Sequence, residues 1–170
     1  MIKRGSWYFS VGCIVLLLLI AFLTGCTTIS KNDGTNKSSS PVTQEELVIK
    51  LERTACFGAC PVYSLMIKGD GTVIYAGEDF VKTEGIQETK ISMDAINQLI
   101  LEFDKVDYFS LKDSYTSFGK SDMPSANTSI SIGGTTKAVK HYLGDPNAPK
   151  QLTELENKID EIVNSAQWIK

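Results

Sequence analysis

The chain has 170 residues, among them 17 basic and 20 acidic side chains, one histidine and four cysteines, and 42% of its residues are hydrophobic. That length suits one ordinary domain, and the composition excludes a multispan membrane protein, a collagen-like chain and a wholly disordered one. Without its first 25 residues the chain keeps 15 basic and 20 acidic groups, a net charge of about −5. Because a phosphate-binding surface needs clustered Lys and Arg, nucleic acid is not an expected partner.

The N-terminus has the pattern of an export signal. Lys3 and Arg4 precede an almost wholly apolar run at 7–23, which is typical of a secretory signal and close to the lower limit for a membrane-spanning helix. The sequence Leu-Thr-Gly-Cys at 23–26 resembles the lipobox of bacterial lipoproteins. The resemblance implies transfer of a diacylglyceryl group to the Cys26 thiol, cleavage before this residue, and acylation of the new amino group, for example with palmitate. The alternative is an uncleaved helix in which Cys26 is incidental.

These features divide the chain into three parts. Residues 1–25 form a predicted lipoprotein signal peptide. Residues 26–44 comprise the lipidated cysteine and a flexible polar tether with no apolar period, spanning roughly 20–25 Å on average. Residues 45–170 form a single folded domain. The expected location is the cell membrane or outer membrane, facing away from the cytoplasm, since two or three acyl chains anchor stably. The expected partners are that membrane and an envelope protein or ligand.

The first half of the domain has the pattern of successive β-strands. Apolar and polar residues alternate at 47–52 and again at 63–67, as in half-buried strands. The turn sequence Lys-Gly-Asp-Gly at 68–71 and the apolar positions within 73–75 complete a predicted hairpin. A further strand is predicted within 80–91.

The centre of the domain predicts an amphipathic helix. Ser92 has the position of an N-cap, and apolar residues then recur with helical spacing. They are Met93, Ile96, Leu99, Ile100 and Phe103. A polar loop at about 112–127 is expected to follow.

The last part predicts a second hairpin and a second helix. A strand that includes Ile130 leads through Gly133-Gly134, which can form a two-residue turn, into a strand at 138–143. Pro149 suits the first turn of the last helix. The apolar stripe of that helix is Leu152, Leu155, Ile159 and Ile162. Short turns favour antiparallel pairing, so the predicted class is α+β: an antiparallel sheet of about five or six strands with two helices, in the order β-β-β-(β)-α-β-β-α.

Cys56 and Cys60 form the most unusual local pattern, with three residues between them at the turn joining the first two strands. Export places them in an oxidising compartment, where thiols pair, and Gly58 can bring the chain back on itself. A structural disulfide, contributing about 2 kcal/mol by loop-closure entropy, is the leading prediction. The alternatives are a redox-active pair, free thiols, and a metal site in which Asp122 and His141 join the cysteines, although the spacing favours neither a redox motif nor zinc.

The cysteine segment also begins a family resemblance. Arg-Thr-x-Cys-x-Gly-x-Cys-Pro-x-Tyr at 53–63 resembles the signature of a family of bacterial envelope domains of unknown function. The resemblance covers about residues 46–165. Its further positions are 69–73, Tyr75, 121–124, 139–141, 148–149, Leu152, Leu155 and 159–160. The resemblance implies a secreted or lipid-anchored protein, and it implies no activity, cofactor or substrate.

Two residues are weak catalytic candidates. His141 is the single histidine, and the strand pattern predicts that it is half-buried and hydrogen-bonded. Asp122 precedes Met-Pro, where an aspartate is most often a turn residue. The two could act as acid and base, but the sequence shows no nucleophile beside them. The acidic residues of the last helix are predicted to form a solvated face; they are Glu154, Glu156, Asp160 and Glu161.

Together these features predict a lipid-anchored envelope lipoprotein whose acidic domain is a binding or structural module. No cofactor and no metal is predicted, and the sequence contains no complete catalytic set. The alternatives are a thiol–disulfide redox protein that uses Cys56 and Cys60, and a hydrolase around Asp122 and His141.

Overall fold

The computed structural model describes residues 46–117 and 119–170, so the predicted signal peptide, Cys26 and the tether lie outside the described residues. The described strands are β1 Val48–Arg53, β2 Val62–Lys68, β3 Thr72–Asp79, β4 Gly85–Lys90, β5 Ser114–Tyr115, β6 Ser125–Ile132 and β7 Thr135–Tyr142. The helices are α2 Met93–Lys105, α3 Lys150–Val163 and α4 Ala166–Ile169, with a short 3₁₀ turn, η2, at Tyr108–Ser110. None of the described helices is long and apolar enough to cross a membrane.

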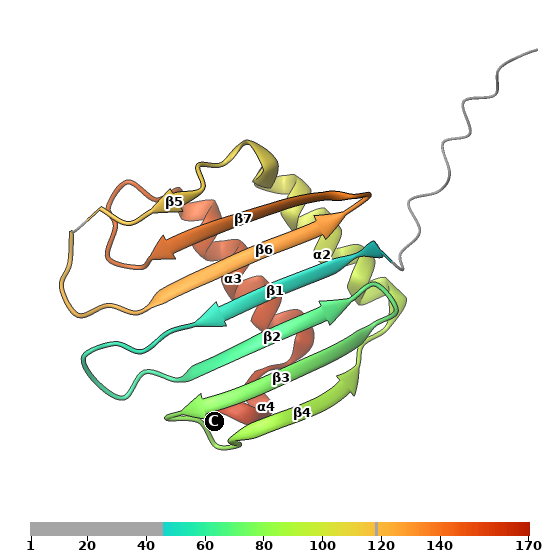
Figure 1. The fold of residues 1–170 in the computed structure, drawn as a ribbon, viewed down its shortest axis with the longest axis horizontal. Coiled ribbons are helices and arrows are strands. Elements are labelled where there is room, and N and C mark those ends of the chain that lie inside the picture. Colours follow the sequence, from blue (N-terminus) through green and yellow to red (C-terminus); the bar gives the residue numbers. More distant parts are fainter. Residues whose placement is uncertain (1–45, 118) are drawn as a thin grey trace, which may run out of the picture. The chain divides into compact units, whose positions relative to one another are not determined.

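The strands form one sheet in the order β4-β3-β2-β1-β6-β7-β5 (Figure 1). β1 lies in the middle, paired antiparallel with β2 on one side and with β6 on the other. The remaining pairs are antiparallel too, except that β5 runs parallel to β7 at the edge. The α+β class and the predicted order of elements are confirmed. The two-residue β5 and the predicted fourth strand, β4, bring the sheet to seven strands.

Two tight turns set the register of the hairpins. Between β2 and β3, the Asp70 carboxylate accepts hydrogen bonds from the backbone N–H and the hydroxyl of Thr72, both at 2.9 Å. Between β6 and β7, Gly133 and Gly134 have φ angles of 56° and 75°, left-handed values that favour glycine. A slip of one residue would turn every inward side chain outward, so these turns fix which residues face the helices.

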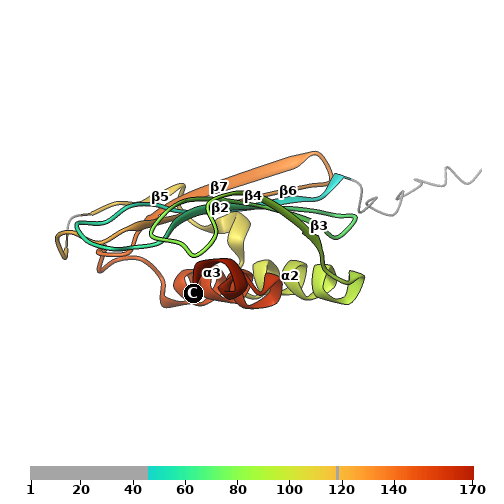
Figure 2. The same ribbon diagram turned by 90° about the horizontal axis from the view of Figure 1, so that it is seen from below.

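α2 and α3 cover one face of the sheet, and none of the described helices lies on the other face (Figure 2). β1 shows the consequence, because Ile49 and Leu51 are buried while Lys50 and Glu52 are exposed. The core residues from the two long helices include Ile96, Leu99, Phe103, Leu152, Leu155 and Ile159, all of which the apolar spacing predicts. Burying each such side chain stabilises the fold by roughly 1.5–3 kcal/mol.

Both long helices begin close to their predicted starts. The hydroxyl oxygen of Ser92 accepts a hydrogen bond from the Ala95 N–H at 3.2 Å, which makes Ser92 the N-cap of α2 as predicted. Pro149 lies one position earlier than predicted. It is the N-cap residue of α3, with an extended backbone, and the helix begins at Lys150.

The polar loop predicted at 112–127 is shorter in the structure, because β6 already begins at Ser125. The first inward residues of β6 are Ala126 and Thr128, which are too small or too polar to form a visible apolar alternation. The hydroxyl of the buried Thr128 lies 2.8 Å from that of Tyr108. This hydrogen bond satisfies both groups, so a polar residue can occupy a core position here.

Candidate functional site

A row of side chains crosses the middle of the sheet and faces α3. Arg53 of β1 lies opposite Tyr63 of β2 and opposite Ala126 of β6, and Ala126 in turn lies opposite His141 of β7. Residues directly opposite one another point to the same face of a sheet, here the face that the helices cover. The short side chain of Ala126 leaves space between Arg53 and His141 for groups from the helix.

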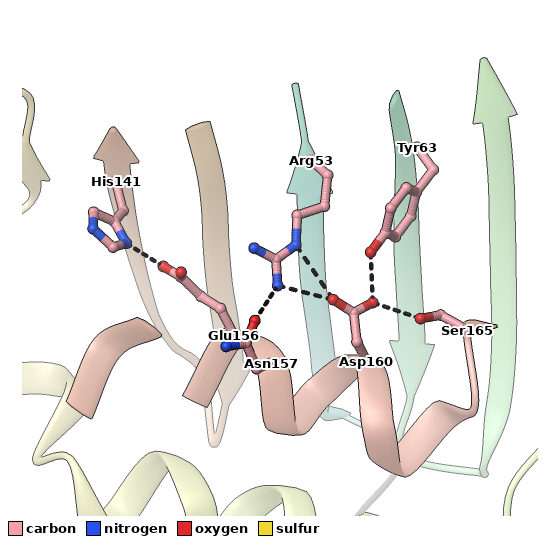
Figure 3. Close-up of polar contacts among 7 residues, drawn as sticks. All are labelled: Arg53, Tyr63, His141, Glu156, Asn157, Asp160 and Ser165. Atoms are coloured by element: carbon pink, nitrogen blue, oxygen red, sulfur yellow. Dashed lines mark hydrogen bonds and ion pairs between the residues drawn. The ribbon is translucent and has the colours of Figure 1, made fainter. Parts of the chain in front are cut away.

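Asp160 of α3 is the centre of a polar cluster on this row. Its Oδ2 accepts hydrogen bonds from Nη2 and Nε of Arg53 at 2.9 and 3.3 Å, and its Oδ1 accepts from the Tyr63 and Ser165 hydroxyls, each at 2.7 Å (Figure 3). Nη2 of Arg53 also donates to Oδ1 of Asn157 at 3.2 Å. These five residues are called the Asp160 cluster below. The side chains of Arg53 and Asp160 are only 13% and 19% exposed, so water screens the ion pair weakly.

The Asp160 cluster leaves little scope for acid–base chemistry. Four donors occupy the Asp160 carboxylate, so it is not available as a general base. Burial, together with the neighbouring carboxylate, raises the pKa of Tyr63 above its ordinary value of 10.0, so the phenol keeps its proton at neutral pH.

A second polar pair, His141 and Glu156, lies beside the Asp160 cluster and is more deeply buried. Nδ1 of His141 lies 2.7 Å from Oε1 of Glu156, and the two side chains are 2% and 0% exposed. Oε2 of Glu156 has no hydrogen-bond partner among the described residues. Burial raises the pKa of Glu156 above its ordinary value, although His141 and Arg53 act in the opposite direction. The predicted hydrogen bond of His141 is confirmed, but the residue is buried rather than half-buried.

The prediction that the acidic residues of the last helix form a solvated face is wrong for two of the four. Glu154 and Glu161 are exposed, whereas Glu156 is buried and Asp160 is largely covered. The sequence does contain a signal for this outcome. Glu156 follows Leu152 by four residues, so it lies on the apolar stripe, and Asp160 follows one turn later.

The Asp160 cluster forms the polar part of a pocket of about 510 Å³. Four segments provide its walls: the loop between β1 and β2, the residue just before β6, the residue just after β7, and the turn and short helix that follow α3. The apolar lining residues are Pro61, Pro124, Leu143, Ala166 and Ile169. The pocket surface is mostly apolar, and its polar groups come from the Asp160 cluster and from Glu161, Asn164 and Lys170.

A disulfide between Cys56 and Cys60 closes the loop that forms the first wall, with a Cα–Cα distance of 5.7 Å. The leading prediction for this pair is confirmed. The N–H of Phe57, within the loop, donates to the carbonyl oxygen of Asp122 at 3.4 Å. This hydrogen bond joins the disulfide loop to the segment that precedes β6. Pro61 directly follows the second cysteine, so the disulfide restrains the part of the loop that lines the pocket.

The opposite wall is formed where the chain turns back after α3. Asn164 ends the helix with a φ of 54°, a left-handed conformation that asparagine tolerates. Ser165 then donates its hydroxyl to Asp160, and α4 brings Trp168 onto the sheet. The indole ring stacks on Tyr75 with 4.8 Å between ring centroids.

The structure does not bring the weak catalytic candidates together. Asp122 is exposed, with a φ of 65°, whereas the imidazole of His141 is buried against Glu156. No contact among the described residues joins the two candidates, and Cys56 and Cys60 are bonded to each other. Within residues 46–117 and 119–170, no group of three or more His, Cys, Asp or Glu side chains could hold a metal ion.

The chain belongs to the family described as a domain of unknown function (DUF6438), whose family model matches residues 47–163. This membership agrees with the predicted resemblance to an uncharacterised domain. A search of the curated proteins finds no match to the chain. The matched segment runs from the start of β1 to the end of α3, so it contains every member of the Asp160 cluster except Ser165.

Replacing Asp160 by Ala should destabilise the domain by about 3 kcal/mol, because it leaves the shielded guanidinium of Arg53 without its carboxylate. Tyr63→Phe removes a single hydrogen bond to a charged group and should cost about 1.5 kcal/mol. Urea unfolding followed by circular dichroism measures both. Glu161→Ala, at the exposed neighbouring position, is the control and should change stability by less than about 0.5 kcal/mol. Equal effects of the Asp160 and Glu161 variants would contradict a central role for the ion pair.

Glu156→Gln should remove a pH dependence of stability. Because folding raises the pKa of Glu156, its contribution is fully present below the unfolded value near 4.5 and is lost as pH rises through the folded value. Glutamine cannot ionise, so the free energy of unfolding of the variant should increase relative to wild type as pH rises from about 4.5 to about 8. Arg53, His141 and Asp160, which surround this carboxylate, stay in place.

Urea midpoints across that pH range measure the effect. Glu154→Gln, at an exposed position of the same helix, provides the matched control and should follow the wild-type pH profile. If the Glu156 variant also ran parallel to wild type, the pKa of the buried carboxyl would not be raised.

Proposed function

We propose that the protein is a lipid-anchored envelope lipoprotein whose domain binds a ligand in the pocket at the Asp160 cluster. The observation that carries the binding role is the pocket itself, about 510 Å³ in volume, whose surface is mostly apolar and lies beside polar groups that the Asp160 cluster fixes. Sites for small ligands typically have roughly 300–1,000 Å³ and this composition.

The pocket is held in shape without a ligand, which favours binding. The Cys56–Cys60 disulfide restrains one wall, and the hydrogen bond from Ser165 to Asp160 restrains the other. A ligand therefore has little protein to order when it enters, and such preorganisation raises affinity.

The chemistry of the lining supports binding rather than catalysis. The carboxylate of Asp160 is occupied by four donors, the sulfur of Cys60 is in a disulfide, and Tyr63 keeps its proton. No described residue that lines the pocket is a histidine or a free thiol. A nucleophile with an adjacent base, which covalent catalysis requires, is therefore not assembled among these residues.

The anchoring part of the proposal rests on the sequence, namely the lipobox-like segment at 23–26 and the polar stretch that follows it. The domain suits such an arrangement. β1 starts at Val48 and ends at Arg53, so the chain enters the sheet at one end and the pocket lies at the other, roughly 17 Å away. A partner can reach the pocket without approaching the point where the tether is attached.

Replacing Cys26 by Ser removes the thiol that would carry the lipid. The variant should leave the membrane fraction and should not incorporate labelled palmitate, as measured by fractionation, immunoblotting and metabolic labelling. Cys13→Ser, within the apolar run, is the control and should remain lipidated. A Cys26 variant that stays in the membrane as an uncleaved chain would overturn the anchoring and leave the binding role standing.

Photo-crosslinking in intact cells tests the binding role. An aliphatic diazirine amino acid in place of Ala166, which is exposed and lines the pocket, should give a defined covalent adduct, measured by mass spectrometry of the purified protein. The same group in place of Gln167, the exposed next residue outside the lining, is the control and should not. Equal adducts at both positions, or none at either, would contradict binding in the pocket.

A further inference from the structure

We infer that the ligand of this pocket is an uncharged peptide segment with an apolar side chain, held through its backbone amide groups. The inference rests on the proposed binding function and adds the chemical class of the ligand. It follows from which charges in the pocket are already paired, which hydrogen-bonding groups remain, and what surrounds them.

The charges inside the pocket are paired with each other. Arg53 is bound by Asp160 at 2.9 Å, and the same carboxylate accepts the hydroxyl hydrogens of Tyr63 and Ser165. An anionic ligand would have to displace Asp160 from Arg53, and a cationic ligand would lie beside the guanidinium. At the Asp160 cluster either ion would lose hydration without gaining an unpaired counter-charge, which disfavours both there.

The remaining hydrogen-bonding capacity is that of neutral groups. Tyr63 and Ser165 donate their hydrogens to Asp160, and the Tyr63 oxygen also interacts with the guanidinium of Arg53, so the Ser165 oxygen is the acceptor that remains. Oδ1 of Asn157 accepts from Arg53, and this fixes the orientation of the amide, because a guanidinium can only donate. Nδ2 of Asn157 therefore keeps its two hydrogens for a ligand. An acceptor beside a donor complements a peptide unit, which offers one N–H and one C=O.

The rest of the lining suits an apolar side chain. Pro61 and Pro124 lie on one side, with Leu143 near them, and Ala166 and Ile169 come from α4 on the other side. Burial of an aliphatic or aromatic group between these walls would supply most of the affinity, and the polar groups would orient the backbone.

The rim distinguishes a peptide from a fatty acid, the other apolar ligand of suitable size. The carboxylate of Glu161 lies 2.7 Å from Nζ of Lys158. Lys170 is exposed at the edge of the pocket, so a fatty acid would place its carboxylate on a solvated lysine, where one ion pair contributes little. A peptide instead needs no counter-charge, because it hydrogen-bonds to neutral groups of the Asp160 cluster, the exposed amide of Asn157 and the buried hydroxyl of Ser165.

A set of probes that differ in charge tests this class. N-acetyl-leucine N-methylamide is neutral, N-acetyl-leucine carries a carboxylate, leucine N-methylamide carries an ammonium group, and octanoate represents a fatty acid. Each is titrated into the full lipidated protein in nanodiscs, and backbone amide shifts are followed by NMR. The neutral diamide should shift signals of the pocket residues with an affinity at least about tenfold above the other three, because only it avoids an unpaired charge.

Matched variants locate the binding. Ala166→Phe, which fills the pocket from an exposed position, should abolish the shifts, whereas Gln167→Phe should keep them. Asn157→Asp replaces the free N–H donors by a carboxylate that Arg53 can still bind, and it should weaken the neutral probe about tenfold. The Asn157 variant keeps the test decisive if the Ala166 variant does not fold.

The outcomes separate the ligand class from the binding role. Tighter or equal binding of a charged probe or of octanoate would overturn the peptide class and leave a binding pocket in place. If no probe shifted any signal but a diazirine adduct formed at position 166, the proposed peptide class of the ligand would be overturned and the binding role would stand. Absence of both the shifts and the adduct would overturn the proposed binding role as well.

Discussion

The ion pair between Arg53 and Asp160 is the contact on which the arrangement of sheet and helix depends. It joins the end of the central strand to α3 across 107 residues of sequence. Apolar contacts are non-directional, so by themselves they would allow α3 to rotate or slide on the sheet. A shielded charge without its partner is strongly unfavourable, and any such movement would separate the pair. The pair therefore fixes the position of α3 along and across the sheet, which hydrophobic burial alone does not determine.

The same contact explains why a pocket lies at this end of the sheet. Asp160 accepts a hydrogen bond from Ser165, and this holds the turn after α3 close to the helix. The chain then continues toward the outer strands, where Trp168 stacks on Tyr75, instead of crossing the ends of β1 and β6. The space between this turn and the disulfide loop stays open, and the polar groups that bound it cannot be replaced by closer apolar packing without breaking the pair.

Most of the fold follows from the sequence, whereas most of the site does not. Alternation in β1 and β2, the cap at Ser92 and the stripe of α3 each depend on neighbouring residues, so local patterns predict them. The start of β6 is missed because Thr128 is buried through a hydrogen bond to Tyr108 rather than through apolarity. The partners of Asp160 are missed for the same reason. A hydropathy pattern predicts which residues are buried through apolar contact, and it carries no information about polar pairs that are distant in the sequence.

A sharper rule does emerge from the two acidic residues of α3. An acidic residue on an apolar helical stripe requires a buried donor on the facing element, because the charge is otherwise too costly. Glu156 and Asp160 are one turn apart, about 6 Å along the helix, while Arg53 and His141 lie two strands apart, about 9.6 Å, with Ala126 between them. The two acidic residues are therefore closer together than their two partners, and the long side chains bridge this difference of about 3.6 Å. They do so with Glu156 directed toward His141 and Asp160 directed toward Arg53. The polar pairing is thus a consequence of strand register: the Gly133-Gly134 turn sets the pairing of β6 with β7, and the pairing of β1 with β6 places Arg53 beside Ala126.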